Sequence, residues 1–241
     1  MMTKYSFLFA TLVTIVMNTL AVVLPLNGVT TKFLSDSQKT LITPSGSTFI
    51  IWSVIFTGLL AISFGIIAGR VTLLSSQLKW YWLSTALNVS WLLCWHYQIP
   101  VIPAFLLFGL MLSNVLVGYK FIGWAKHLYL VYTSWTVVAA TINIVILLQY
   151  NFGWTAPSNV EPAYIASFLL VVAITIFSLM GKVHRSIVPL GVGIWSLIGI
   201  YREQPNSVIQ QSSVVLIIVA IILIVLQLLK MNTLDSTKLN H

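Results

Sequence analysis

Asparagine and aromatic side chains recur at helical spacing in two apolar stretches, and these residues have the clearest capacity for chemistry. Asn88, Trp91 and Trp95 are spaced at i, i+3 and i+7. In the second stretch, four residues are spaced at i, i+3, i+7 and i+11: Tyr132, Trp135, Ala139 and Asn143. On a helix each set lies along one face, where rings can stack and amides can form hydrogen bonds.

An amide placed in hydrocarbon needs a hydrogen-bonding partner, so both stripes are expected to face protein or a ligand rather than lipid. One interpretation is helix packing held together by asparagine. The other is an aromatic pocket for a flat hydrophobic ligand, in which a few amides and hydroxyls set the orientation. The residues alone leave both interpretations open.

The elements that position these stripes are membrane spans. Of the 241 residues 59% are hydrophobic and 7% are charged, against about 25% charged in soluble domains. A helical span needs roughly 20 apolar residues. Eight segments qualify: 5–26, 48–68, 80–97, 101–122, 128–149, 162–181, 186–201 and 207–230. We predict an all-α, polytopic membrane helical bundle with about eight transmembrane helices.

The formal charge of +8 is distributed as a topology signal rather than as a nucleic-acid patch. Nine of the twelve lysines and arginines lie at the two termini and in alternate gaps between spans. The other gaps hold only Lys32, Lys39 and Arg202. Basic residues in short loops mark the cytoplasmic side, so both termini are predicted to be cytoplasmic.

Several function classes lack the residues they need. No acidic or basic side chain lies in the middle of a predicted span, which argues against proton-coupled and ion-coupled carriers. The histidines do not converge on a nucleophilic device, and Cys94 is the single cysteine. His96, beside Trp95, could ligate a metalloporphyrin or be an ordinary interfacial histidine. We therefore expect no enzyme, no metal and no required cofactor.

Two further segments bear on mechanism. The gap from Asn27 to about Ser47 is long enough for a lid over the bundle, and equally typical of an ordinary solvated connection. Pro189, Gly191 and Gly193 in the seventh predicted span could form a hinge or a simple kink.

The chain resembles the TspO/MBR family, the tryptophan-rich sensory proteins related to the mitochondrial translocator protein. The resemblance covers roughly residues 1–150. It rests on motifs in the second, third and fifth spans: Pro44, Phe49 and Trp52; Leu87, Asn88 and Trp91; Tyr132, Trp135, Ala139 and Asn143. The family's Trp-x-Pro-Pro loop motif is missing, and Val131 replaces a proline. Three further spans and a late Trp195–Gly199 pattern are similar to a longer, eight-span subgroup.

The resemblance implies a five-helix unit, residues 1–150, that binds porphyrins or related ligands under the first loop, with residues 151–241 adding three transmembrane helices. Together with the stripes it predicts these ligand-binding residues: Trp52, Phe56, Asn88, Trp91, Trp95, Tyr132, Trp135, Ala139 and Asn143. The expected function is an integral membrane sensory or binding protein of the bacterial cytoplasmic membrane. A bound porphyrin as ligand, surrounding lipid and a homodimer fit this picture. A facilitator or transporter of small hydrophobic metabolites is the alternative.

Overall fold

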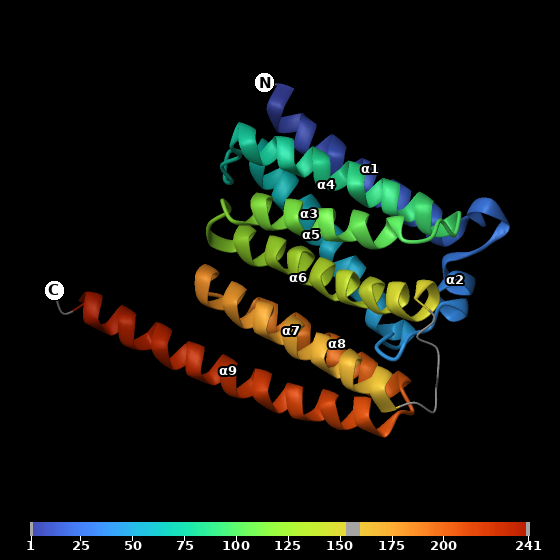
Figure 1. Ribbon diagram of the computed structural model, residues 1–241. Helices are drawn as coiled ribbons and strands as arrows, with labels where there is room; N and C mark the ends of the chain where they lie inside the picture. The colour runs from blue at the N-terminus through green and yellow to red at the C-terminus, as the bar shows by residue number, and fades with distance from the viewer. Residues whose placement is uncertain (1, 153–159, 240–241) are drawn as a thin grey trace. The chain divides into compact units, whose positions relative to one another are not determined.

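A computed structural model of the chain describes residues 2–152 and 160–239, and all regular structure in these two ranges is helical (Figure 1). The α-helices are α1 (Met2–Val23), α2 (Thr31–Ser37), α3 (Ile51–Ile67), α4 (Ser75–His96), α5 (Ile102–Gly118), α6 (Gly123–Ile146), α7 (Val160–His184), α8 (Val188–Glu203) and α9 (Ser207–Leu239). Short 3-10 turns cover Leu26–Gly28 and Gly46–Ile50, and a π-helical turn, η3, covers Leu147–Asn151.

Each of the eight predicted segments coincides with a helix, and α2 is an additional short helix that the hydropathy pattern did not indicate. Five segments in the described part of the chain are long and apolar enough to cross a membrane: Lys4–Gly28, Gly46–Ile67, Gly123–Asn151, Pro162–His184 and Ser207–Asn232. The α5 helix is apolar but has only 17 residues, and α8 has 16. A helical membrane bundle is therefore confirmed at this coarser level.

The chain divides into two compact units, each described here by itself. The first contains Met1–Thr40 and Ile50–Thr155, and the second contains Leu41–Phe49 and Ala156–His241. In the first unit α1 packs against α3 and α4, α4 against α5, α5 against α6, and α6 against α3. These contacts close a ring of five helices.

A polar seam joins α1 to α4 inside this ring. Residues one helical turn apart on α1 pair with residues one turn apart on α4: Thr11 with Tyr81 at 2.8 Å, Thr14 with Thr85 at 3.3 Å, and Asn18 with Asn88 at 2.7 Å. All six side chains are buried. Because hydrocarbon offers no competing partners, these bonds fix which face of α1 meets α4.

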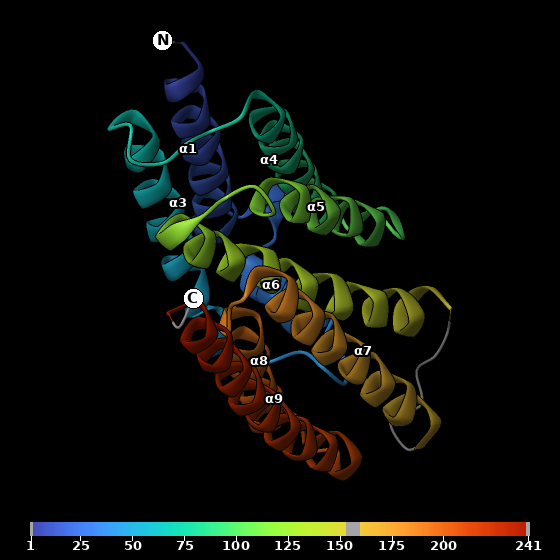
Figure 2. The same cartoon turned by 90° about the vertical axis from the view of Figure 1, so that its left-hand side faces the viewer.

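The second unit holds α7, α8 and α9, which pack pairwise on one another (Figure 2). Pro189 lies in the first turn of α8, where its missing N–H would have no partner in any case, so it begins the helix rather than bending it. The Gln227 amide of α9 donates to the carbonyls of Gly181 and Ser186 at the α7–α8 turn. The Gly181 carbonyl also accepts from the Ser186 N–H at 3.0 Å, so Gln227 adds a second donor to a turn that is already closed by a backbone bond.

Candidate functional site

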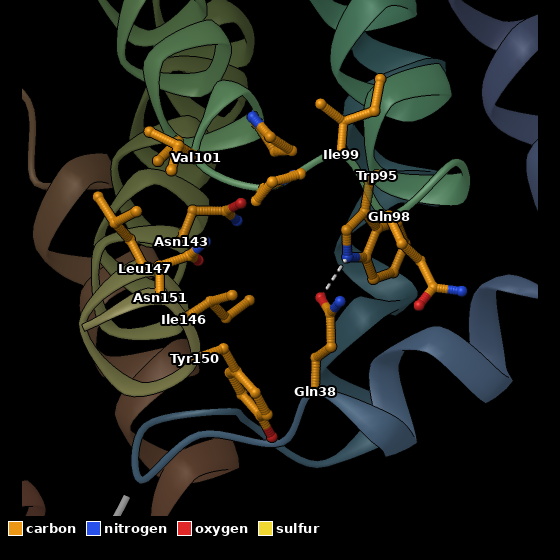
Figure 3. Close-up of a pocket in the computed structure, with 13 residues that line it drawn as sticks. Gln38, Trp95, Gln98, Ile99, Val101, Asn143, Ile146, Leu147, Tyr150 and Asn151 are labelled. Atoms are coloured by element: carbon orange, nitrogen blue, oxygen red, sulfur yellow. Dashed lines mark hydrogen bonds between the residues drawn. The ribbon is translucent and has the colours of Figure 1, made fainter. Parts of the chain in front are cut away.

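A cavity of about 170 Å³ lies in the first unit where α4 ends, α5 begins and α6 passes into η3 (Figure 3). Its lining combines aliphatic groups with side-chain amides and two aromatic residues. The lining residues are Gln38, Trp95, Gln98, Ile99, Pro100, Val101, Pro103, Ala104, Asn143, Ile146, Leu147, Tyr150 and Asn151. None carries a formal charge at neutral pH, so the cavity can stack rings and form neutral hydrogen bonds.

Stacked tryptophans form the wall that α4 contributes. The rings of Trp91 and Trp95 are 5.7 Å apart at an interplanar angle of 8°. Trp91 also packs against a buried cluster of Leu107, Leu110 and Ala140. This packing holds the Trp91 ring in place, and the parallel stack aligns Trp95 at the cavity surface.

His96 does not face the cavity, although it follows Trp95. Its side chain is fully buried, its Nδ1 donates to the Leu92 carbonyl at 2.8 Å, and its Nε2 is 3.3 Å from the Thr31 hydroxyl. Both ring nitrogens are therefore used in protein contacts. The described residues contain no group of three histidine, cysteine or carboxylate side chains that could hold a metal ion.

The segment that contributes Gln38 to the cavity lining, residues 31–40, is called here the lid segment. It starts with α2, whose first turn is capped because the Thr30 hydroxyl accepts from the Phe33 N–H at 3.2 Å. Trp95 Nε1 donates to Gln38 Oε1 at 3.1 Å, the bond drawn in Figure 3. From the other side the Tyr150 hydroxyl lies 3.2 Å from the Ser37 carbonyl and 3.1 Å from the Lys39 carbonyl. Side chains of α4 and η3 thus fasten the lid segment.

The charged residues at this end of the unit are on the surface of α2. Asp36 lies 2.8 Å from Lys32, one turn away on the same helix, and 4.0 Å from Lys39. The hydrogen bond from Lys32 and the two positive charges lower the pKa of the half-exposed Asp36 carboxyl. These ions support the solvent face of α2 and take no part in the cavity lining.

The rim between α4 and α5 is strained. Gln98 has φ 51°, and the β-branched Val101 has φ 67°. The Ile102 N–H donates to the Pro100 carbonyl at 2.7 Å, so Val101 is the central residue of a γ-turn with positive φ. Such backbone costs about 1–3 kcal/mol and concentrates at functional sites.

The nine predicted ligand residues fall into three groups. Trp95 and Asn143 line the cavity, with Trp91 stacked behind Trp95 and Ala139 packed on the same buried cluster. A separate aromatic cluster lies between α3 and α6, where the Trp52 ring is 5.4 Å from Phe56 and 6.2 Å from Tyr132. The third group, Asn88 and Trp135, is buried outside the cavity lining, and the Asn88 oxygen accepts from Asn18 in the α1–α4 seam.

Sequence reasoning missed the residues that connecting segments bring to the cavity. Gln38 follows α2, residues 98–104 form the α4–α5 turn and its first helical residues, and Tyr150 lies in η3. The cluster of Gln98, Pro100 and Pro103 indicates a turn. Nothing in its composition predicts that this turn and the lid segment meet.

Five buried polar atoms in the described part of the ring have no hydrogen-bonding partner: Asn88 Nδ2, Trp91 Nε1, Asn114 Nδ2, Tyr132 Oη and Ser134 Oγ. All five come from α4, α5 and α6. Leaving such a group unpaired costs about 1–3 kcal/mol. Three of the five belong to the predicted ligand residues: Asn88, Trp91 and Tyr132.

Fold and site together define a polytopic helical membrane protein with a neutral, tryptophan-walled cavity under a fastened lid segment. A family model described as TSPO-like protein matches residues 4–229, nearly the whole chain. The chain belongs to the TSPO-like family. The match continues through α7, α8 and most of α9, so the last three helices are part of the family pattern. No curated protein and no solved structure matches the chain significantly.

Proposed function

We propose that the protein is a sensor or binding protein that takes up a flat hydrophobic ligand, such as a porphyrin, beneath the lid segment. The observation that carries this proposal is the stacked Trp91–Trp95 pair beside a cavity lined by neutral amides. Aromatic walls favour flat rings, and isolated amides orient a ligand without requiring it to be charged.

The small volume of the cavity indicates that a large ligand can bind only if the lid segment moves. At about 170 Å³ it is smaller than the roughly 300–1,000 Å³ of typical ligand pockets. A single aromatic ring fits this space, whereas a porphyrin macrocycle requires the lid segment to move away. The bonds of Gln38 with Trp95 and of Tyr150 with the lid carbonyls are the contacts that such opening breaks.

The test is a titration of the reconstituted full chain with protoporphyrin, followed by quenching of tryptophan fluorescence. Trp95→Leu and Asn143→Leu are expected to weaken binding at least about tenfold, because they remove the stacking wall and an orienting amide. The matched control is Trp80→Leu, near the opposite end of the same helix and 41% exposed. Equal affinities in Trp95→Leu and the control would reject the cavity as the site.

The aromatic cluster between α3 and α6 gives this experiment a second arm. Trp52→Leu removes the ring that contacts both Phe56 and Tyr132. If Trp52→Leu abolishes binding and Trp95→Leu does not, the ligand lies between α3 and α6 instead. If the protein carries the probe across the membrane of proteoliposomes, the proposed function changes from binding to facilitated transport.

We also propose that α1 and α3 to α9 cross a bacterial cytoplasmic membrane as eight spans with both ends inside. The asymmetric distribution of basic residues supports this topology. In a Cys94→Ser background, Ser35→Cys in α2 and Lys120→Cys after α5 are expected to react with an impermeant thiol reagent from opposite sides. Reaction of both from one side would overturn the topology.

A further inference from the structure

Helix α8 forms hydrogen bonds with the segment that follows the lid segment in the chain. Residues Leu41–Phe49, called here the linking segment, belong to the same compact unit as α8. Trp195 Nε1 donates to the Thr48 carbonyl at 2.9 Å, the Ser45 N–H donates to the Gly199 carbonyl at 3.0 Å, and Gln204 Nε2 donates to the Thr43 carbonyl at 2.8 Å. All three bonds engage the backbone of the linking segment, so they hold its path rather than one side chain.

Gly199 makes this close approach feasible. A Cβ added there would overlap the Thr48 hydroxyl oxygen and lie 3.0 Å from Pro44 Cβ. Thr48 is 3% exposed and Pro44 is buried, so neither can move aside into solvent. The Trp195 and Gly199 of the late sequence pattern thus act on the loop that begins the second predicted span.

The residues that α8 binds follow the lid segment closely in the sequence. Lys39, whose carbonyl accepts from Tyr150, is only four residues before Thr43, whose carbonyl accepts from Gln204. Three side chains in this short stretch are buried: Thr40, Ile42 and Thr43. Four residues reach at most about 14 Å when fully extended. Because this connection is short, the hydrogen bonds between α8 and the linking segment restrict the movement of the C-terminal end of the lid segment.

We propose that α8 anchors the lid segment through the linking segment, so that the C-terminal helices regulate access to the cavity. This inference rests on the proposed function for its consequence, since a closed lid traps a ligand. In a two-state description the α8 contacts favour the closed state, and a change that weakens them shifts the population toward the open state. Ligand release then becomes faster without any change in the cavity lining.

Two alanine variants on α8 form a matched pair for the test. Gly199→Ala places a methyl group against Thr48 and Pro44, whereas Gly191→Ala places the same group on the same helix with nothing within 4 Å. Trp195→Phe is a second variant that keeps an aromatic ring but removes the N–H that binds the Thr48 carbonyl. The full chain in lipid nanodiscs is used throughout, and helix content is compared by circular dichroism.

Amide hydrogen exchange of residues 31–49 is the first readout, and it needs no ligand. Gly199→Ala and Trp195→Phe are expected to speed exchange in the linking segment and, at least about fivefold, in the lid segment. Gly191→Ala should match the unsubstituted protein. Faster exchange confined to residues 41–49, or equal exchange in Gly199→Ala and Gly191→Ala, overturns the proposal.

Dissociation of protoporphyrin is the second readout. Release from Gly199→Ala is expected to be at least about fivefold faster than from Gly191→Ala. Equal release rates, with tight binding retained, overturn the regulation while the proposed function stands. If the unsubstituted protein binds no probe, the proposed function fails, and exchange in the lid segment alone decides whether α8 anchors it.

Discussion

Replacing the two asparagines of the α1–α4 seam by leucine should have unequal costs, although they share one hydrogen bond. Asn18 Nδ2 donates to Asn88 Oδ1 at 2.7 Å and also to the Thr14 carbonyl at 2.8 Å, while Asn88 Nδ2 has no partner. Asn18→Leu leaves the fully buried Asn88 amide with neither atom paired, at a cost of about 1–3 kcal/mol. Asn88→Leu loses the same bond but removes an unpaired amide, so its net cost should be near zero.

A double-mutant cycle measures the bond itself. Interhelical hydrogen bonds in membranes average about 0.6 kcal/mol and reach about 1.7 kcal/mol. The short distance and the burial place Asn18–Asn88 in the upper part of this range. The free energy of unfolding would be measured by reversible denaturation in lipid–detergent micelles. An Asn88→Leu variant that is less stable than Asn18→Leu refutes the reasoning, because the unpaired amide would then have a partner such as a bound ligand.

Three further predictions concern the rim, the second unit and α2. Val101→Gly should raise the free energy of unfolding by about 1 kcal/mol, because glycine adopts a positive φ without strain, and an unchanged thermal midpoint would contradict the γ-turn. Gln227→Met should lower it by about 0.5–1.5 kcal/mol by removing two hydrogen bonds from α9 to the α7–α8 turn, and an equal thermal midpoint would refute that role. Lys32→Ala should raise the pKa of Asp36 toward its ordinary value in an NMR titration. Since that pKa is lowered in the folded chain, the stabilisation by the pair exists above the ordinary pKa of aspartate and is lost as pH falls through the lowered value.

The helical structure and the approximate positions of the spans could be predicted from the sequence, because a segment that crosses hydrocarbon must be apolar and helical. Each long apolar run is helical, since a backbone in lipid must satisfy its own hydrogen bonds. Boundaries were less predictable. The third predicted span began at residue 80, but α4 begins at Ser75, because Gln77 accepts from the Leu74 N–H and donates to the Val117 carbonyl of α5. These bonds are tertiary and polar, and they leave no mark in a hydropathy profile.

The candidate site was predictable only on its helical side. Trp95 and Asn143 could be selected because polar and aromatic residues within apolar runs stand out. Gln38 could not, since glutamine in a connecting segment is ordinary until the fold brings it to Trp95. The same spacing argument grouped Tyr132 with Asn143, yet eleven residues of helix separate them by roughly 16 Å, and Tyr132 contacts Trp52 instead.

The polar seam between α1 and α4 also bears on the order of events during membrane insertion. Asn18 and its partner Asn88 are 70 residues apart in the sequence, a stretch that takes roughly 4 to 14 s to synthesise. During that interval Thr11, Thr14 and Asn18 have entered the membrane without the side chains that later pair with them. Each of these side chains also donates to a carbonyl one turn earlier in α1, so the first helix can enter hydrocarbon with these donors satisfied locally before the helix that completes its polar face has been made.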